Sequence, residues 1–184
     1  GFPFIFVATP FGILFGVVAI ESGLQLVEAI GFSVVVIAGA AQFTALQLMN
    51  DNVPTLLVLT SALAVNLRMA MYSASLTPHL GKAPVWQRGI LAYFTIDQTY
   101  ACAIAAYENN PQWSVRDKVQ YFAGAATAIC PIWYVATFIG AWIGSGIPDA
   151  LALDFAVPIT FLAMIGPMLR TGAHRAAALA SAVL

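Results

Sequence analysis

Charged side chains are scarce in this sequence: 8% of its 184 residues are Asp, Glu, Lys or Arg, whereas 61% are hydrophobic. Soluble domains usually carry about 25% charged residues, so a surface facing water cannot be built from this composition. The net charge of −1 and the lack of a basic run argue against a nucleic-acid partner. The two cysteines, Cys102 and Cys130, lie in apolar runs, so we interpret them as packing thiols rather than as a disulfide.

The sequence also lacks the residue patterns of enzymes and metal proteins. No cluster has the spacing of metal ligands, and no glycine-rich loop precedes a lysine that could hold phosphate. Ser145 lies between two glycines, but no histidine is placed to activate it as a nucleophile. We therefore expect no metal, no cofactor and no enzymatic activity.

Long apolar runs separated by short polar breaks are what the sequence does contain. A helix needs about 20 mainly apolar residues to cross a bilayer, and the runs approach this length. We predict an all-α polytopic membrane protein, a single transmembrane domain over residues 1–184 with six to seven transmembrane helices. The predicted spans are residues 4–20, 32–49, 55–75, 89–107, 119–143 and 151–165, with residues 21–31 as a polar turn and an incomplete last helix at 174–184.

Proline and glycine interrupt several of these spans. Pro10 and Gly12 predict a kink or break in the first span, while Gly12 and Gly16 together form a face of small residues for close helix approach. Two interpretations stay open for this span: a kinked packing helix, or a broken helix whose freed backbone groups line a site. The other hinge candidates are Gly39, Gly124 and Pro131.

A short internal similarity suggests a repeat. The sequence of residues 38–41 recurs 85 residues later at 123–126, and the same offset relates residues 10–12 to residues 95–97. Because three spans per unit is an odd number, a second copy would enter the membrane in the opposite sense. The pattern predicts a 3+3 inverted repeat with halves 1–76 and 89–166, an architecture of secondary transporters.

The distribution of basic residues predicts the orientation. Without Arg68, four Lys and Arg residues lie on the side that the N-terminus shares, and two lie on the opposite side: Arg116, Lys118, Arg170 and Arg175 against Lys82 and Arg88. Cytoplasmic loops carry the excess of these residues. We therefore expect a cytoplasmic N-terminus.

Arg68 and Asp97 are the charges inside consecutive apolar runs. A guanidinium cannot neutralise itself by deprotonation, so within a bilayer it needs a partner, a wet cavity or the membrane edge. Arg68 lies nine residues before Thr77, and Asp97 lies nine residues after Arg88. Both should therefore lie about 13 Å from the same membrane face. Consecutive spans pack antiparallel, so the two side chains can meet directly or through water.

A guanidinium and a carboxylate match the two charged ends of a zwitterionic amino acid. The hypothesis is that Arg68 holds the substrate carboxylate or keeps Asp97 charged, and that Asp97 handles the ammonium group or a coupling proton. The alternatives are that Arg68 snorkels to the membrane edge and that Asp97 belongs to an ion pair that locks two helices. Neutral hydrogen bonds would come from Gln42, Asn66, Tyr72, Thr95 and Tyr100, and the apolar side chain would lie against Ala40, Phe43, Gly124 and Trp133.

Four stretches together resemble the AzlC-type branched-chain amino-acid permeases. They are Pro10-Phe11-Gly12 with Gly16, residues 38–43 (Ala-Gly-Ala-Ala-Gln-Phe), Asn66-Leu67-Arg68 with Tyr72, and residues 95–101 (Thr-Ile-Asp-Gln-Thr-Tyr-Ala). The resemblance implies a multi-pass exporter of leucine, isoleucine and valine-like amino acids in the bacterial inner (plasma) membrane, working with a small AzlD-type membrane subunit. Members of the family are usually longer, so we expect missing ends. Gln98 stands where the family suggests a second acid.

The sequence thus predicts a carrier that exports hydrophobic amino acids by alternating access, coupled to the proton gradient. Two alternatives stay open. A passive channel would show flux without saturation, and a membrane subunit that only scaffolds a partner would bind no small molecule.

Overall fold

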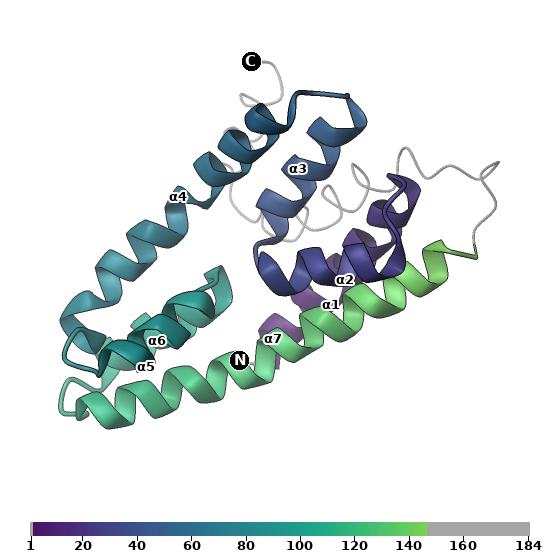
Figure 1. The fold of residues 1–184 in the computed structure, drawn as a ribbon. Helices are drawn as coiled ribbons and strands as arrows, with labels where there is room; N and C mark the ends of the chain where they lie inside the picture. The colour runs from purple at the N-terminus through teal and green to yellow at the C-terminus, as the bar shows by residue number, and fades with distance from the viewer. Residues whose placement is uncertain (1, 147–184) are drawn as a thin grey trace, which may run out of the picture. The chain divides into compact units, whose positions relative to one another are not determined.

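The computed structural model describes residues 2–146, which belong to one compact unit, Gly1–Ile147. Within this range the chain forms seven α-helices and no β-strand (Figure 1). The sixth and seventh predicted spans and most of the turn before them lie outside the described residues. The helices are α1 (Phe2–Glu21), α2 (Leu26–Val35), α3 (Gly39–Asn50), α4 (Thr55–Leu80), α5 (Val85–Tyr93), α6 (Asp97–Asn109) and α7 (Val115–Gly144).

Helices α1 and α7 pack against each other along most of the length of α1 (Figure 1). A Cβ atom on Gly16 would lie 2.2 Å from the carbonyl oxygen of Thr137, and one on Gly140 would lie 1.9 Å from the carbonyl oxygen of Ile13. Only glycine fits at such a backbone contact. The predicted close-approach face at Gly12 and Gly16 is therefore confirmed. On the α7 side of the contact, Gly140 and Gly144 are the small residues that pack against α1.

Both of these helices continue through their prolines. Helix α1 has no interruption at Pro10 or Gly12, and α7 has none at Gly124 or Pro131, so the structure has no break in the helix at these four hinge candidates. A kink or hinge at these residues stays a prediction. A proline in a membrane helix is tolerated where neighbouring groups satisfy the freed backbone. For the first span, the structure corresponds to the packing helix among the two open interpretations.

The interruptions fall elsewhere, in the second and fourth predicted spans. Residues 32–49 are not one helix, because α2 ends at Val35 and α3 begins at Gly39. Residues 89–107 are also two helices, since α5 ends at Tyr93 and α6 begins at Asp97. Helix α2 occupies part of the predicted 21–31 turn. Of the hinge candidates, Gly39 alone stands at an interruption.

Consecutive β-branched residues explain the first interruption. Residues 34–37 read Val-Val-Val-Ile, and such side chains lose rotamer freedom in a helix. The second interruption has a capping arrangement: the backbone N–H of Ile96 donates to Thr99 Oγ1 at 2.9 Å, and that hydroxyl donates to the Phe94 carbonyl at 2.6 Å. These two bonds satisfy polar groups that the broken backbone would otherwise leave unpaired.

The offset of 85 residues does not relate matching local structures. Residues 10–12 lie inside the unbroken α1, whereas residues 95–97 cross an interruption. Likewise, residues 38–41 begin α3, whereas residues 123–126 lie inside α7. The inverted repeat therefore stays a prediction that these pairs do not support.

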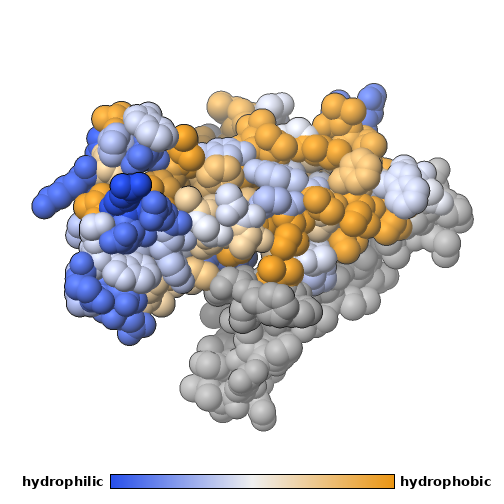
Figure 2. Space-filling view, turned by 90° about the horizontal axis from the view of Figure 1, so that it is seen from below, coloured by the Kyte–Doolittle hydropathy of each residue, from blue (hydrophilic) through white to orange (hydrophobic). Residues whose placement is uncertain are grey.

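Much of the described surface is apolar. Leu56, Leu59, Leu63, Leu67 and Met71 follow one face of α4 and are each more than half exposed. Figure 2 shows hydrophilic side chains gathered at one end of the unit, where the α4–α5 and α6–α7 turns lie, and mainly hydrophobic side chains over the rest of that face. In the described part, α4 and α7 are long and apolar enough to cross a membrane.

Candidate functional site

The two interruptions meet in the structure. The hydroxyl group of Tyr93, the last residue of α5, donates to the carbonyl of Val34 near the end of α2 and lies 3.1 Å from the hydroxyl of Tyr134 in α7. A cavity of about 190 Å³ lies between the interruptions. It is lined by residues 35–38, by residues 92, 93, 95 and 96, and by Asn66 and Met69 of α4.

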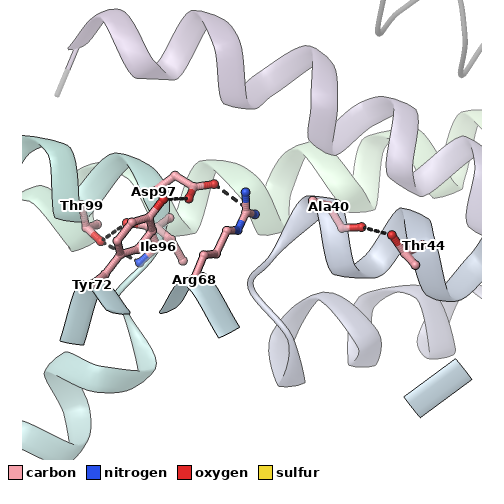
Figure 3. A network of polar contacts seen from close by, with 7 residues as sticks. All are labelled: Ala40, Thr44, Arg68, Tyr72, Ile96, Asp97 and Thr99. Atoms are coloured by element: carbon pink, nitrogen blue, oxygen red, sulfur yellow. Dashed lines mark hydrogen bonds and ion pairs between the residues drawn. The ribbon is translucent and has the colours of Figure 1, made fainter. Parts of the chain in front are cut away.

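An ion pair joins α4 to the start of α6 beside this cavity. Arg68 Nη2 lies 3.1 Å from Asp97 Oδ2, and the hydroxyl of Tyr72 donates to Asp97 Oδ1 at 2.9 Å (Figure 3). Asp97 is the first residue of α6, where the helix dipole also favours a negative charge. Two neighbours and a helix terminus thus hold one carboxylate.

The ion pair is not closed off. The side chains of Arg68 and Asp97 are 31% and 40% exposed within this unit. Arg68 Nε is buried and has no hydrogen-bond partner, so the guanidinium keeps donors that the carboxylate of Asp97 does not use. Because the ion pair uses Nη2 and the Arg68 side chain is 31% exposed, a second carboxylate could bind the exposed part of the guanidinium while the pair remains formed.

Two tyrosines flank the ion pair. The rings of Tyr72 and Tyr100 stack with centroids 4.2 Å apart, and the Tyr100 hydroxyl lies 3.0 Å from Ser75 Oγ. The stacking fixes the orientation of Tyr72, because each ring restricts the other. Tyr72 can then present its hydroxyl to Asp97.

Asn66 and Thr95 line the cavity from opposite sides. Thr95 donates its hydroxyl to the Leu91 carbonyl at 2.8 Å, so it closes the end of α5. Asn66 Oδ1 is buried without a hydrogen-bond partner. A buried acceptor of this kind is costly unless a donor from water or a ligand reaches it.

Gln42 and Trp133 belong to a different environment. Gln42 is fully buried and donates Nε2 to Ser33 Oγ at 3.1 Å, and Ser33 Oγ lies 3.0 Å from Thr137 Oγ1. The ring of Trp133 stacks on that of Phe15, with centroids 6.4 Å apart. Both side chains pack between α7 and the helices beside it. The structure does not place them at the cavity.

Of the predicted acceptors of an apolar side chain, Phe43 and Trp133 both pack against Phe15, whereas Gly124 does not join them. Phe43 is buried against Phe11 and Phe15, whereas a Cβ atom added to Gly124 of α7 would meet no atom within 4 Å. The sequence reasoning missed Tyr93, Thr99 and Met69. Thr99 carried no clear signal, because a capping box has Ser or Thr at the N-cap and Glu or Gln three residues later, whereas this helix has Ile96 and Thr99 at those positions.

Within residues 2–146, no group of three or more His, Cys, Asp or Glu residues could hold a metal ion. The thiols of Cys102 and Cys130 are free. The chemistry that this site offers is thus ionic and hydrogen-bonding: one fixed positive charge, one fixed negative charge, an amide and two phenols.

In the described residues, the exposed apolar side chains and the two helices long and apolar enough to cross a membrane indicate an α-helical membrane protein. Its particular kind follows from comparison with known families: the family model described as AzlC protein matches residues 3–147, and the chain belongs to this family. The family relationship suggested by the four sequence stretches is therefore confirmed.

Relatives from three organisms are named as membrane proteins. The chain is 26% identical to the inner membrane protein YgaZ of Escherichia coli (strain K12), over 89% of this chain and 68% of that protein. It is 25% identical to an uncharacterized membrane protein of Helicobacter pylori, over 83% and 65%, and 26% identical to one of Archaeoglobus fulgidus, over 99% and 78%. The chain thus spans about two thirds of the first two relatives. No solved structure matches it.

Proposed function

We propose that this protein is a secondary transporter that exports branched-chain and other hydrophobic amino acids across a bacterial inner membrane. The observation that carries the proposal is the Arg68–Asp97 ion pair beside the two interrupted helices. Charges within membrane helices are costly and usually serve substrate or ion pathways. Interrupted helices are tolerated in the membrane where they line a protein cavity, and carriers place their sites there.

The geometry suggests how a zwitterion would bind. The α-carboxylate accepts from the unused donors of Arg68, and the α-ammonium group donates to Asp97. Tyr72 and Tyr100 hold the Asp97 side of the site. Because the ion pair links α4 to α6, binding that rearranges it also changes how these helices contact each other. Such a change is the step that alternating access needs.

Proton coupling, a small AzlD-type membrane subunit and a multi-pass topology with a cytoplasmic N-terminus are parts of the same proposal. Asp97 is the group that we assign to the coupled proton, since it is the carboxylate of the ion pair. The family relationship favours the small subunit. The name of the E. coli relative favours the inner membrane.

The experiment measures leucine and valine efflux from preloaded proteoliposomes, with and without a pH gradient and a candidate small subunit. We expect saturable, gradient-dependent efflux that falls by about tenfold or more in Arg68→Ala, a loss of about 1.4 kcal/mol of transition-state stabilisation. Arg68→Lys should also be impaired, because an ammonium group lacks the planar fork of donors. Asp97→Asn should lose the dependence on the pH gradient.

Arg116→Ala is the matched control, since Arg116 is an exposed cation at the start of α7 and away from the cavity. Flux without saturation would favour the passive channel. No flux under any condition would favour the scaffold. If Arg68→Ala and Asp97→Asn transported like the wild-type protein, the ion pair would be a structural link between helices and the proposed mechanism would be wrong.

A further inference from the structure

A second, larger cavity adjoins the one at the interruptions. It has a volume of about 560 Å³ and lies between α3 and α4, next to the end of α2. This volume lies within the range of about 300–1,000 Å³ that is typical of small-molecule pockets. Asn66 and Val36 line both cavities, so the two spaces meet at these side chains.

Alanines create the space. Ala41 and Ala45 lie one turn apart on α3 and are both buried, and Ala62 faces them from α4. Phe32 and Val58 complete the apolar wall. Longer side chains at the three alanine positions would fill the gap between the helices. The cavity is therefore a property of these small residues rather than of loose packing.

Asn66 marks the polar end of this apolar space. Its side-chain oxygen is buried and has no hydrogen-bond partner. Asn66 and Ala62 lie one turn apart on α4, so both face the cavity. One unused acceptor thus lies at the polar end of an apolar cavity. The complement of this arrangement is a ligand with a hydrogen-bond donor at one end and a hydrophobic tail.

We propose that the cavity between α3 and α4 is the subsite for the hydrophobic side chain of the transported amino acid, with Asn66 at the mouth as a second acceptor, besides Asp97, for its ammonium group. This inference rests on the proposed transport function and defines its substrate class. The cavity is wider than a branched side chain requires. The protein therefore accepts the larger phenylalanine as well as leucine, isoleucine and valine.

The test is the substrate profile of Ala62→Leu, measured as the efflux of alanine, valine, leucine and phenylalanine from proteoliposomes that contain the full chain. Filling the cavity should lower the transport efficiency for leucine and phenylalanine by about tenfold or more, since one methylene in a hydrophobic pocket already discriminates by about tenfold. Alanine efflux should change much less. Val58→Ala enlarges the same cavity and should shift the profile toward phenylalanine.

Ala64→Leu is the matched control. Ala64 lies two residues further along α4, is exposed and does not line the cavity. Both variants replace alanine with leucine in α4, so they change the helix propensity by a similar amount. Ala64→Leu should leave the ratio of leucine to alanine efflux at the wild-type value. Ala62→Val, a smaller addition, should give an intermediate shift and replaces Ala62→Leu if the larger residue prevents folding.

Several outcomes would overturn the subsite. Wild-type efflux of leucine without phenylalanine would exclude the broad substrate class. Equal losses for all four substrates in Ala62→Leu and Val58→Ala would mean that a lipid or another helix occupies the space. A wild-type protein that transports, with variants whose profiles match it, would refute the subsite alone. The absence of saturable transport in the wild-type protein would refute the proposed function and the subsite with it.

Discussion

The α1–α7 pair and the interrupted helices differ in how closely their backbones approach. Helices α1 and α7 are continuous, and their backbones touch at Gly16 and Gly140. Helices α2–α3 and α5–α6 are broken, and their breaks enclose a cavity next to an ion pair. In lipid, helices associate mainly through close packing, so the first arrangement gives stability. The broken helices do not pack closely in this way, so their breaks add no such stability. The position of the breaks at a cavity favours a functional role instead.

The polar side chains also differ between the packed helices and the interrupted helices. Ser33, Gln42 and Thr137 form a fully buried cluster that ties α2 and α3 to α7. The side chains of Arg68 and Asp97, in contrast, remain partly exposed, and the guanidinium of Arg68 keeps unused donors. Gln42 Oε1 also lacks a hydrogen-bond partner, so the two groups differ in exposure rather than in how fully they are hydrogen-bonded. A fully buried cluster is closed to water and ligands and holds one arrangement, whereas a partly exposed ion pair can exchange partners. We therefore expect variants in the two regions to differ in what they damage.

The largest expected effect comes from Gly140→Ala. A Cβ atom there would lie 1.9 Å from the Ile13 carbonyl oxygen, so α1 and α7 must separate. Overpacking of cores usually costs about 1–3 kcal/mol, and we expect the upper end or more because the obstacle is backbone. Thermal unfolding in detergent would measure the loss. Gly124→Ala is the control on the same helix, since a Cβ there meets nothing within 4 Å.

That control should be stabilised, because alanine is favoured over glycine inside a helix by about 0.5–1 kcal/mol. The two substitutions are chemically identical and occur in one helix, yet they should shift the unfolding temperature in opposite directions. Equal unfolding temperatures would contradict the role of the α1–α7 contact as the tightest part of the unit.

Sequence reasoning predicted one side of this comparison better than the other. The Gly12 and Gly16 spacing predicted the close-packed face correctly, because helix geometry alone puts residues four apart on one side. Equal depth in consecutive spans indicated that Arg68 and Asp97 could meet, directly or through water, and the structure has them in direct contact. That depth assumed an unbroken fourth span, whereas this span is two helices.

Of the five hinge candidates, only Gly39 lies at an actual interruption, and the interruption between α5 and α6 was not predicted. Proline is the strongest local signal, but α1 and α7 keep Pro10 and Pro131 within continuous helices. The actual breaks contain β-branched residues, which only weakly disfavour a helix. A break forms at such residues when tertiary contacts, such as that of Tyr93 with Val34, bond the freed backbone groups. Such contacts join residues far apart in the sequence. The cavity between α3 and α4 could not be predicted for the same reason.

A smaller effect is expected from Thr137→Val. This change keeps the shape of the side chain and removes the hydroxyl that lies 3.0 Å from Ser33 Oγ. Leaving the buried partner short of a hydrogen bond should cost about 1–3 kcal/mol in the free energy of unfolding. Thr127→Val is the control on the same helix, because the exposed Thr127 hydroxyl bonds only to carbonyls of its own helix.

Thr127→Val should stay within about 0.5 kcal/mol of the wild-type protein. If the two valine variants unfolded alike, the Ser33, Gln42 and Thr137 cluster would not contribute to joining α2 and α3 to α7. Of these contacts with α7, only the glycine contact between α1 and α7 would then be left to stabilise the packing around α7.

The smallest loss of stability is expected from Tyr72→Phe, which removes the hydroxyl that donates to Asp97 Oδ1 at 2.9 Å. Asp97 is 40% exposed, so the unfolding temperature should barely change. Leucine efflux should nevertheless fall by about tenfold, because Tyr72 orients the Asp97 carboxylate that we propose binds the substrate, and a loss of about 1.36 kcal/mol of transition-state stabilisation is tenfold in rate.

Ser75→Ala separates this effect from a general disturbance of the stacked tyrosines. It removes the hydroxyl that lies 3.0 Å from that of Tyr100 and leaves the bond between Tyr72 and Asp97 in place. Efflux should therefore stay within about twofold of the wild-type rate, since a bond between neutral exposed groups contributes little. The opposite result would be a Tyr72→Phe protein with a lower unfolding temperature and wild-type leucine efflux. The partly exposed ion pair would then stabilise the fold, as the glycine contact does, and would not serve transport.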